Sequence, residues 1–327
     1  MGEQKILLET KKLKKYYQVN SALQSKKKKY LKAVDGVDLV VHQGEVVGLV
    51  GESGCGKSTL GKTVLKVHSV TEGEIIYNGE HIEDYNLAKM RPLRRDMQMI
   101  FQDPYAALNP RMTVFASARE PLTIQDMGLT EEQKEERTKE ILNKVGVTEQ
   151  HFEKYPHELS GGQRQRVVIA RAMITNPKFV VCDEPVSALD VSVRAQVLNL
   201  MRRLQRETGV SYLFISHDLS VVKYICDTIY VMYLGKVVEK SSKKELFENP
   251  SHPYTQALIS AIPIPDLYTD RERIILSGDI PSPVNPPMGC PFHTRCKYAT
   301  ERCMESVPEL RDIGGGHCVA CHRIGEF

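Results

Sequence analysis

The residues from Gly51 to Thr59 have the composition and spacing of a loop that binds phosphate. They read Gly-Glu-Ser-Gly-Cys-Gly-Lys-Ser-Thr, follow the apolar run EVVGLV at 45–50 and precede a helical pattern. In such a loop, backbone N–H groups face the phosphates and the helix dipole favours their negative charge. Lys57 would reach the β- and γ-phosphates, and the Ser58 hydroxyl would bind Mg²⁺. The alternative is a glycine turn that merely begins a helix, and the apolar strand in front of the loop argues against it. The predicted nucleotide-binding residues are Gly51, Ser53, Gly54, Cys55, Gly56, Lys57, Ser58 and Thr59.

Asp183 and Glu184 end another apolar run, FVVCDE. Ligands of α/β proteins collect at the carboxyl ends of parallel strands, which is where these carboxylates would lie. Asp183 suits the Mg²⁺ shell, and Glu184 can orient or deprotonate the attacking water. An acidic residue after a strand is a weak signal alone. Combined with the phosphate loop, it predicts hydrolysis of the bound nucleotide.

The segment Ser160-Gly161-Gly162-Gln163 predicts a second helix start that binds an anion. Ser160 followed three residues later by Gln163 is a capping box. Two glycines in the first turn let backbone amides approach a ligand closely. A helix that is only capped would not need the second glycine, so we expect these four residues to bind phosphate.

An α/β framework is needed to position these residues. Continuous apolar runs are typical of parallel strands that are covered on both faces. Helical patterns at 192–207 and 218–226 separate some of these runs, which indicates a mostly parallel sheet. The predicted strands are 45–50, 178–183, 211–215 and 228–233.

Two further regions have a different character. The stretch 104–176 contains helical patterns and no strong strand, so it predicts an inserted helical subdomain. Repeated prolines after residue 262 predict an extended connector into a cysteine-rich tail. We therefore expect a main domain at 1–262 and an extension at 263–327.

Composition and charge exclude several classes of protein. Hydrophobic residues make up 41% and charged residues 26%, a balance typical of globular proteins in water. No stretch approaches the roughly 20 apolar residues of a membrane span, and the N-terminus has no signal pattern, so we expect a cytosolic chain. The basic run Lys26–Lys29 suits either anionic lipid or a solvated loop. Without interleaved aromatic residues, it does not indicate a nucleic-acid partner.

The ordered set of motifs resembles the ATPases of ABC transporters over residues 5–262. The interval of about 20 residues between Ser160 and Asp183 is typical of that family. The resemblance implies an ABC-type α/β fold with a mostly parallel core sheet, an antiparallel β subdomain and a helical subdomain. It also implies that ATP lies between two subunits, bound by the phosphate loop of one and the signature helix of the other. Ser160, Gly161, Gly162, Gln163 and Asp190 would then serve the ATP of the partner.

The same resemblance assigns further residues of the ATP site. Gln102 in MIFQDP resembles the glutamine that senses Mg²⁺ and the lytic water, and His217 resembles the histidine that contacts the γ-phosphate. Asp190 in SALD belongs to the segment that resembles the D-loop. Tyr17 or Tyr16 resembles the aromatic residue that stacks on adenine, and the sequence does not decide between them. The expected catalytic residues are thus Glu184, His217 and Gln102.

The segments MIFQDPYAALNPRMTV, NPSHPYTQALISAIPIPD and PSPVNPPMGCPFHTRC are similar to the F-type ATPase subunit of oligopeptide and dipeptide importers. This resemblance implies a D-type ATPase partner, two membrane permeases and an extracytoplasmic peptide-binding protein. It places the chain peripherally at the cytoplasmic face of the cell membrane. Two alternatives are a non-transport ABC ATPase and a component of a phosphonate-cleaving complex. The cargo stays open, since nickel or another small solute is also compatible.

Five of the eight cysteines lie in the last 38 residues, which indicates a metal or cluster site in a reducing cytosol. Their wide, uneven spacing suits a [4Fe–4S] cluster more than zinc, for which only Cys318 and Cys321 have the usual spacing. Related importer subunits carry such clusters, and their final His-x-Val-x-Cys resembles residues 317–321. Cys318 departs from that pattern and is a possible substitute for Cys321. Zinc, with help from nearby histidines, and free thiols are the alternatives. The resemblance implies the ligands Cys290, Cys296, Cys303 and Cys321.

Overall fold

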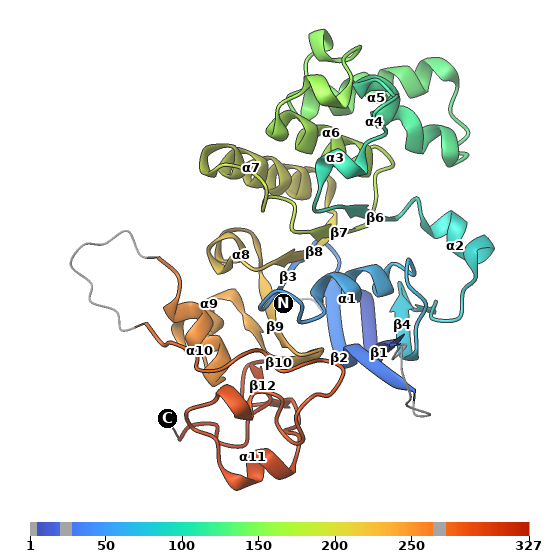
Figure 1. Cartoon of the computed structure of the whole chain (residues 1–327). Coiled ribbons are helices and arrows are strands. Elements are labelled where there is room, and N and C mark those ends of the chain that lie inside the picture. Colours follow the sequence, from blue (N-terminus) through green and yellow to red (C-terminus); the bar gives the residue numbers. More distant parts are fainter. Residues whose placement is uncertain (1–4, 20–27, 264–272, 327) are drawn as a thin grey trace. The chain divides into compact units, whose positions relative to one another are not determined.

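The computed structural model describes residues 5–19, 28–263 and 273–326 (Figure 1). Lys26 and Lys27 of the basic run, and residues 264–272 of the predicted connector, lie outside the described residues. Within the described ranges, no helix combines the length and the apolar character that crossing a bilayer requires. The chain forms two compact units, each of which is made of segments that are distant in sequence.

The first unit includes His42–Glu45 and Tyr85–Ile215. Its strands β6, β7 and β8 are parallel, with β7 in the centre. Every residue of β7 and β8 is buried, because both faces of these strands are covered. The elements are α2 (Leu87–Leu93), β6 (Met97–Ile100), α3 (Pro104–Ala107), α4 (Val114–Ile124), α5 (Glu131–Lys144), the 3₁₀ turns Glu149–His151 and Pro156–Glu158, α6 (Gly161–Met173), β7 (Phe179–Asp183), α7 (Val191–Thr208) and β8 (Ser211–Ser216).

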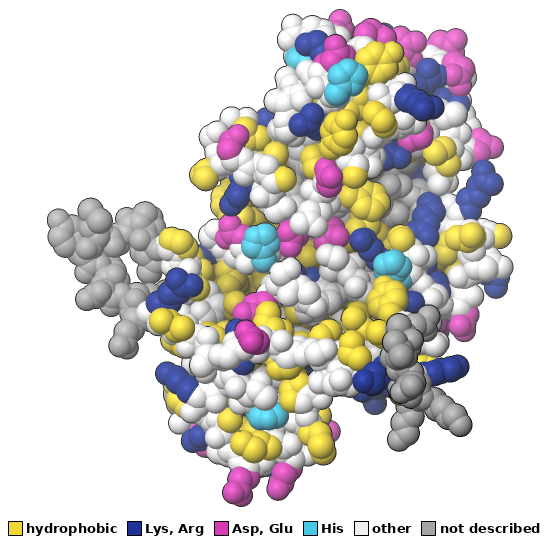
Figure 2. All heavy atoms as spheres, viewed as in Figure 1, with side chains coloured by type: hydrophobic (Ala, Val, Ile, Leu, Met, Phe, Trp, Pro, Cys, Tyr) yellow, Lys and Arg dark blue, Asp and Glu magenta, His cyan; other side chains and the backbone are white. Residues whose placement is uncertain are grey.

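The regular elements of the stretch 104–176 in the first unit are all helices or 3₁₀ turns. Its helix α5 begins with a capping box, in which Thr130 and Gln133 bond to each other's backbone N–H. The acidic side chains of α5 lie on the exposed surface (magenta, upper right in Figure 2), where Glu135 pairs with Lys139 at 2.6 Å. Buried Leu142 and Thr138 face the other way, so α5 is an amphipathic helix at the surface of this unit.

The second unit includes Ile6–Val41, Val46–Asp84 and the residues from Ser216 onward. Strands β3 and β9 are parallel, whereas β9, β10, β12 and β11 continue the sheet in antiparallel order. A separate sheet has the order β2-β1-β4-β5. The elements are β1 (Ile6–Val19), β2 (Lys29–His42), β3 (Val46–Val50), α1 (Lys57–Val64), β4 (Glu72–Tyr77), β5 (Glu80–His81), α8 (Leu219–Ile225), β9 (Thr228–Tyr233), β10 (Lys236–Ser242), α9 (Lys243–Glu248), α10 (Pro253–Ser260), the 3₁₀ turn His293–Arg295, α11 (Glu301–Glu305), β11 (Arg311–Asp312) and β12 (Cys318–Val319).

The predicted fold class is confirmed, because parallel strands and helices form the framework and an antiparallel sheet accompanies it. The four predicted strands appear as β3, β7, β8 and β9. The second unit contains residues from both sides of the predicted boundary at 262–263. That boundary therefore stays a prediction.

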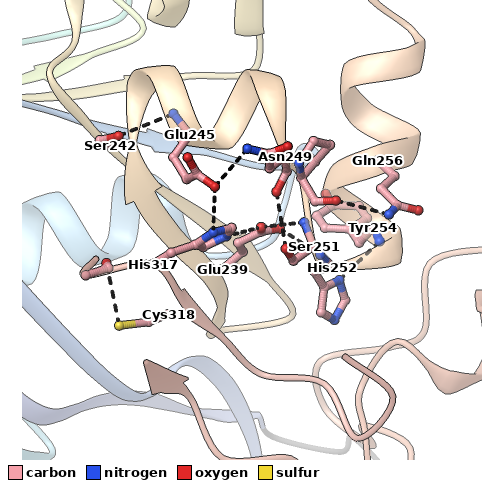
Figure 3. A network of polar contacts seen from close by, with 12 residues as sticks. Glu239, Ser242, Glu245, Asn249, Ser251, His252, Tyr254, Gln256, His317 and Cys318 are labelled. Carbon is pink, nitrogen blue, oxygen red and sulfur yellow. Dashed lines mark hydrogen bonds and ion pairs between the residues drawn. The ribbon is translucent and has the colours of Figure 1, made fainter. Parts of the chain in front are cut away.

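A buried carboxylate joins the C-terminal tail to the sheet of the second unit (Figure 3). Glu239 on β10 accepts hydrogen bonds from the backbone N–H of Ser251 at 2.8 Å and of His252 at 3.0 Å. The Glu239 carboxylate also lies 2.7 Å from Nε2 of His317, and the side chains of Glu239 and His317 are almost fully buried. Since His317 immediately precedes β12, this network pins the tail beside β10.

Candidate functional site

The phosphate loop follows β3 and leads into α1, as the sequence predicts. Its first and last glycines adopt backbone conformations that L side chains rarely reach, with φ of +151° at Gly51 and +106° at Gly56. A Cβ atom would lie 2.1 Å from the carbonyl oxygen of Met232 at Gly51, and 1.9 Å from that of Ala33 at Gly56. Only glycine fits at either place, so the loop is shaped by close backbone packing.

Lys57 lies at the first position of α1, with its side chain folded back over the loop. It is buried, and its Nζ donates to the carbonyl oxygens of Gly51 at 2.8 Å and Glu52 at 2.9 Å. Ser58 and Thr59 follow in the first turn, and Ser53 and Gly54 form the exposed tip of the loop. Cys55 is buried beneath them, and burial raises the pKa of its thiol. A buried cationic side chain thus lies against the backbone of the loop.

The two candidate aromatic residues have different surroundings in the second unit. The hydroxyl of Tyr16 donates to the carboxylate of Asp35. Tyr17 lies next to Thr59 of the phosphate loop. Burial raises the pKa of Tyr17, and its hydrogen bond with the Thr59 hydroxyl partly offsets that rise. Its ring meets His68 edge to face, with centroids 5.9 Å apart. Tyr17 is therefore the aromatic residue beside the loop.

Asp183 and Glu184 lie at the end of β7 in the first unit. Asp183 is buried, whereas Glu184 is half-buried and has a positive φ of +47°. The side-chain amide of Gln102 donates to the Glu184 carboxylate at 3.0 Å. The structure thus brings together two of the three predicted catalytic residues.

The segment Ser160–Gln163 starts α6 with the predicted capping box. Ser160 is exposed, and Gln163 also contacts Nε2 of His151 at 3.1 Å. The second glycine has a structural reason that sequence reasoning missed. A Cβ at Gly162 would lie 2.4 Å from Cγ1 of Val193 on α7. A side chain at this position would force Val193 to move, so the close packing of α6 against α7 favours a glycine there, whatever this helix start binds.

The remaining predicted residues are exposed. Asp190 caps α7 by accepting from the N–H of Val193 at 3.0 Å, and this hydrogen bond is the main cause of its lowered pKa. His217 follows β8 and is exposed at the start of the loop before α8. The predicted site residues therefore divide between the two units. The phosphate loop, Tyr17 and His217 belong to the second unit. Gln102, Asp183, Glu184, Asp190 and the segment Ser160–Gln163, from here on the signature segment, belong to the first.

Four of the five tail cysteines line one small cavity of about 20 Å³. Burial is the largest cause of the raised pKa of Cys290, to about 12, and the other three thiols of the cavity also raise it. Cys318 is not part of this lining, since it lies on β12 with its Sγ 3.8 Å from the carbonyl oxygen of Gly316. The cysteines of the cavity are Cys290, Cys296, Cys303 and Cys321.

The described residues include no group of three or more His, Cys, Asp or Glu side chains placed to hold a metal ion. A single zinc ion would draw four sulfurs to about 2.3 Å from one point, and the cysteines around the cavity do not converge in that way. The geometry therefore does not support the predicted metal site by itself, and the iron–sulfur cluster stays a prediction.

Two family models match the chain. Residues 34–187 match the model described as "ABC transporter", which includes the phosphate loop, the signature segment and the end of β7. Residues 238–303 match the model described as "Oligopeptide/dipeptide transporter, C-terminal region". The second match begins in β10 and ends at Cys303.

Similar proteins and structures agree with these models. The chain is 49% identical to the oligopeptide transport ATP-binding protein AppF of Bacillus subtilis, with 98% of each chain covered. It is 48% identical to the dipeptide transport ATP-binding protein DppF of Escherichia coli, covering 99% of this chain and 96% of that protein. A dimeric post-hydrolysis structure of the ATP-binding cassette MJ0796 with ADP and Pi is 28% identical. It covers 72% of this chain and 99% of the cassette, with a TM-score of 0.65.

Proposed function

The chain belongs to the ABC transporter ATPases of the oligopeptide and dipeptide type, and we propose that its ATP hydrolysis drives import of short peptides. The observation that carries this proposal is the pair of family matches on one chain, a nucleotide-binding region followed by the peptide-transporter C-terminal region. Neither a non-transport ATPase nor a component of a phosphonate-cleaving complex is favoured by relatives that match nearly full length.

The proposed roles are those that the motifs and the resemblance to ABC ATPases imply, and two local contacts support them. The loop 51–59 binds the phosphates, with Lys57 as the cation and Ser58 as a Mg²⁺ ligand together with Asp183. Glu184 activates water and is oriented by Gln102, which donates to its carboxylate at 3.0 Å. His217 contacts the γ-phosphate, and Tyr17 stacks on adenine, since it lies beside the loop.

The proposed assembly contains a second ATPase subunit of the D type, two membrane permeases and an extracytoplasmic binding protein. Its location is the cytoplasmic face of the membrane, where a peripheral subunit meets the permeases. The chain carries one phosphate loop and one signature segment, so the segment from Ser160 to Gln163, with Asp190, would serve the ATP of the partner subunit. AppF is an oligopeptide transport protein and DppF a dipeptide transport protein, so the similarity to both supports a peptide cargo.

We also propose that the four cysteines of the cavity hold a [4Fe–4S] cluster. Four thiols around one cavity match the ligand number of such a cluster, in which each thiolate binds its own iron, so the sulfurs lie farther apart than around a single zinc ion. The absence of Cys318 from the cavity favours Cys321 as the fourth ligand. When bound, the cluster would supply a covalent cross-link within the tail.

The function is tested by uptake into proteoliposomes that contain the permeases, the partner ATPase and the binding protein. Labelled di- and oligopeptides should accumulate only with ATP. Lys57→Ala should abolish uptake, because loss of a hydrogen bond to a charged group weakens binding roughly 10–150-fold. Lys62→Ala, in the last turn of the same helix, is the matched control and should retain uptake. ATP-driven accumulation of Ni²⁺ without peptide would overturn the proposed cargo.

A further inference from the structure

Glu52, the second residue of the phosphate loop, is held through all of its polar groups. Its backbone N–H donates to the hydroxyl oxygen of Tyr254 at 2.8 Å. Its carbonyl oxygen accepts from Nζ of Lys57 at 2.9 Å. Its carboxylate accepts two hydrogen bonds from Arg295, from Nη1 at 2.6 Å and from Nη2 at 3.1 Å. A bidentate guanidinium–carboxylate pair fixes orientation as well as distance.

Arg295 comes from the cysteine-rich tail, 243 residues away in the sequence. It ends the 3₁₀ turn His293–Arg295 and immediately precedes Cys296. Its side chain is only 7% exposed, whereas that of Glu52 is 25% exposed. The hydrogen bonds to Glu52 are the main cause that raises the pKa of Arg295. The pair is therefore shielded from solvent and keeps more of its strength than a surface ion pair.

An aromatic cluster makes this contact rigid. The rings of Tyr233, Tyr254 and Phe292 have centroids 4.8–5.4 Å apart. The Arg295 guanidinium lies 6.0 Å from the centroid of Tyr233. Phe292 is almost fully buried and lies two residues after Cys290. The same packed rings therefore carry Tyr254 and the turn that presents Arg295.

The charge of Arg295 matters for the binding of phosphate by the loop. A carboxylate in a loop that binds polyphosphate repels its ligand unless a cation neutralises it. Arg295 and Tyr254 both fall within the region matched by the peptide-transporter C-terminal model, whereas Glu52 falls within the ABC match. The nucleotide loop is thus restrained by a part of the chain that the ABC match does not include.

We propose that Arg295 is a positioning residue through which the cysteine-rich tail sets the affinity of the phosphate loop for ATP. This inference rests on the proposed function, since it needs the loop to bind nucleotide. Arg295 acts through Glu52 and does not itself contact the nucleotide. It neutralises Glu52, so a change in the fold of the tail that separates this pair changes nucleotide affinity.

The test is the Kd of the full-length chain for a non-hydrolysable ATP analogue in the presence of Mg²⁺, measured at equilibrium. Arg295→Met should raise the Kd about tenfold, the low end for a hydrogen bond to a charged group. Combining Arg295→Met with Glu52→Gln should return the Kd to within about threefold of the wild type, because the unpaired charge is gone. Arg311→Met removes an exposed arginine of the same tail and is the matched control.

Each other outcome contradicts the inference in a recognisable way. If Arg295→Met leaves the Kd unchanged, the tail does not set the affinity of the loop. If the double variant stays as weak as Arg295→Met, the residue acts only on folding of the tail, which thermal unfolding without nucleotide would show independently. If the wild-type chain does not bind ATP at all, the proposed function fails before this inference is reached.

Discussion

At the scale of single residues, Glu184 combines a strained backbone with a directed side chain. A non-glycine residue at a φ of +47° costs about 1–3 kcal/mol, and such strain persists where the surroundings fix it. Here the N–H of Glu184 donates to the carbonyl oxygen of Ile215 at 3.0 Å, and its own carbonyl accepts from the Ser187 hydroxyl at 3.1 Å. The carboxylate accepts from Gln102 at 3.0 Å, and we propose that it also orients the attacking water.

Glu184→Gln should therefore bind Mg-ATP normally and hydrolyse it poorly. The amide keeps the shape of the side chain but cannot accept a proton, and general base catalysis is worth roughly 10²–10⁴-fold in rate. The measurement is phosphate release by the assembled complex, together with the Kd for ATP. Glu153→Gln, an exposed carboxylate of the same unit, should leave both values unchanged. Near-normal turnover of Glu184→Gln would remove Glu184 from its proposed role.

At the scale of elements, sequence patterns predicted the strands whose formation depends on the residues within them. The apolar runs that became β3, β7, β8 and β9 are buried on both faces, so their composition alone indicates parallel strands. The pairing of β12 with β10 and the contact of Arg295 with Glu52 join residues about 80 and 243 positions apart. Neither the periodicity of the sequence nor a local motif predicts contacts between residues so far apart in the chain. The packing of Gly162 against Val193 was missed for the same reason.

The cysteine-rich tail gives a prediction at this scale. Anaerobically purified protein should be brown and contain about four irons per chain, as a [4Fe–4S] cluster requires. Cys321→Ser should lose most of that iron, because Cys321 lines the cavity. Cys318→Ser is the matched control and should retain it, since Cys318 lies on β12 outside the lining. Stoichiometric zinc without iron in the wild-type preparation, or iron loss only in Cys318→Ser, would contradict the proposed ligands.

At the scale of the whole molecule, we propose that one chain supplies one half of each of two ATP sites that it shares with a partner subunit. It has one phosphate loop at 51–59 and one signature segment at Ser160–Gln163. The similar cassette MJ0796 was solved as a dimer with ADP and Pi. For this chain, the proposed partner is a D-type subunit. The resemblance to ABC ATPases implies this division, because the chain has one copy of each motif. The sequence could not predict which surfaces meet, because that depends on a second chain.

Ser160→Arg should separate binding in the isolated subunit from turnover in the complex. Ser160 is exposed and caps α6, so the substitution costs about 1 kcal/mol of helix stability and leaves the loop at 51–59 intact. ATP binding by the isolated chain should therefore stay within about twofold of the wild type. Hydrolysis and uptake by the assembled complex should fall at least tenfold, because an arginine at this helix start blocks the approach of the partner's ATP.

Thr130→Arg is the matched control for this prediction. Thr130 caps α5 with the same capping-box geometry, in which its hydroxyl accepts from the N–H of Gln133 at 3.3 Å, as Ser160 accepts from Gln163. Both substitutions remove a helix cap, but only Ser160 belongs to the segment proposed to serve the partner. Turnover should therefore survive Thr130→Arg. If the isolated Ser160→Arg chain loses ATP binding, the segment serves its own nucleotide and the arrangement across two subunits is wrong. If both variants impair the complex equally, loss of the cap explains the effect and the segment has no special role.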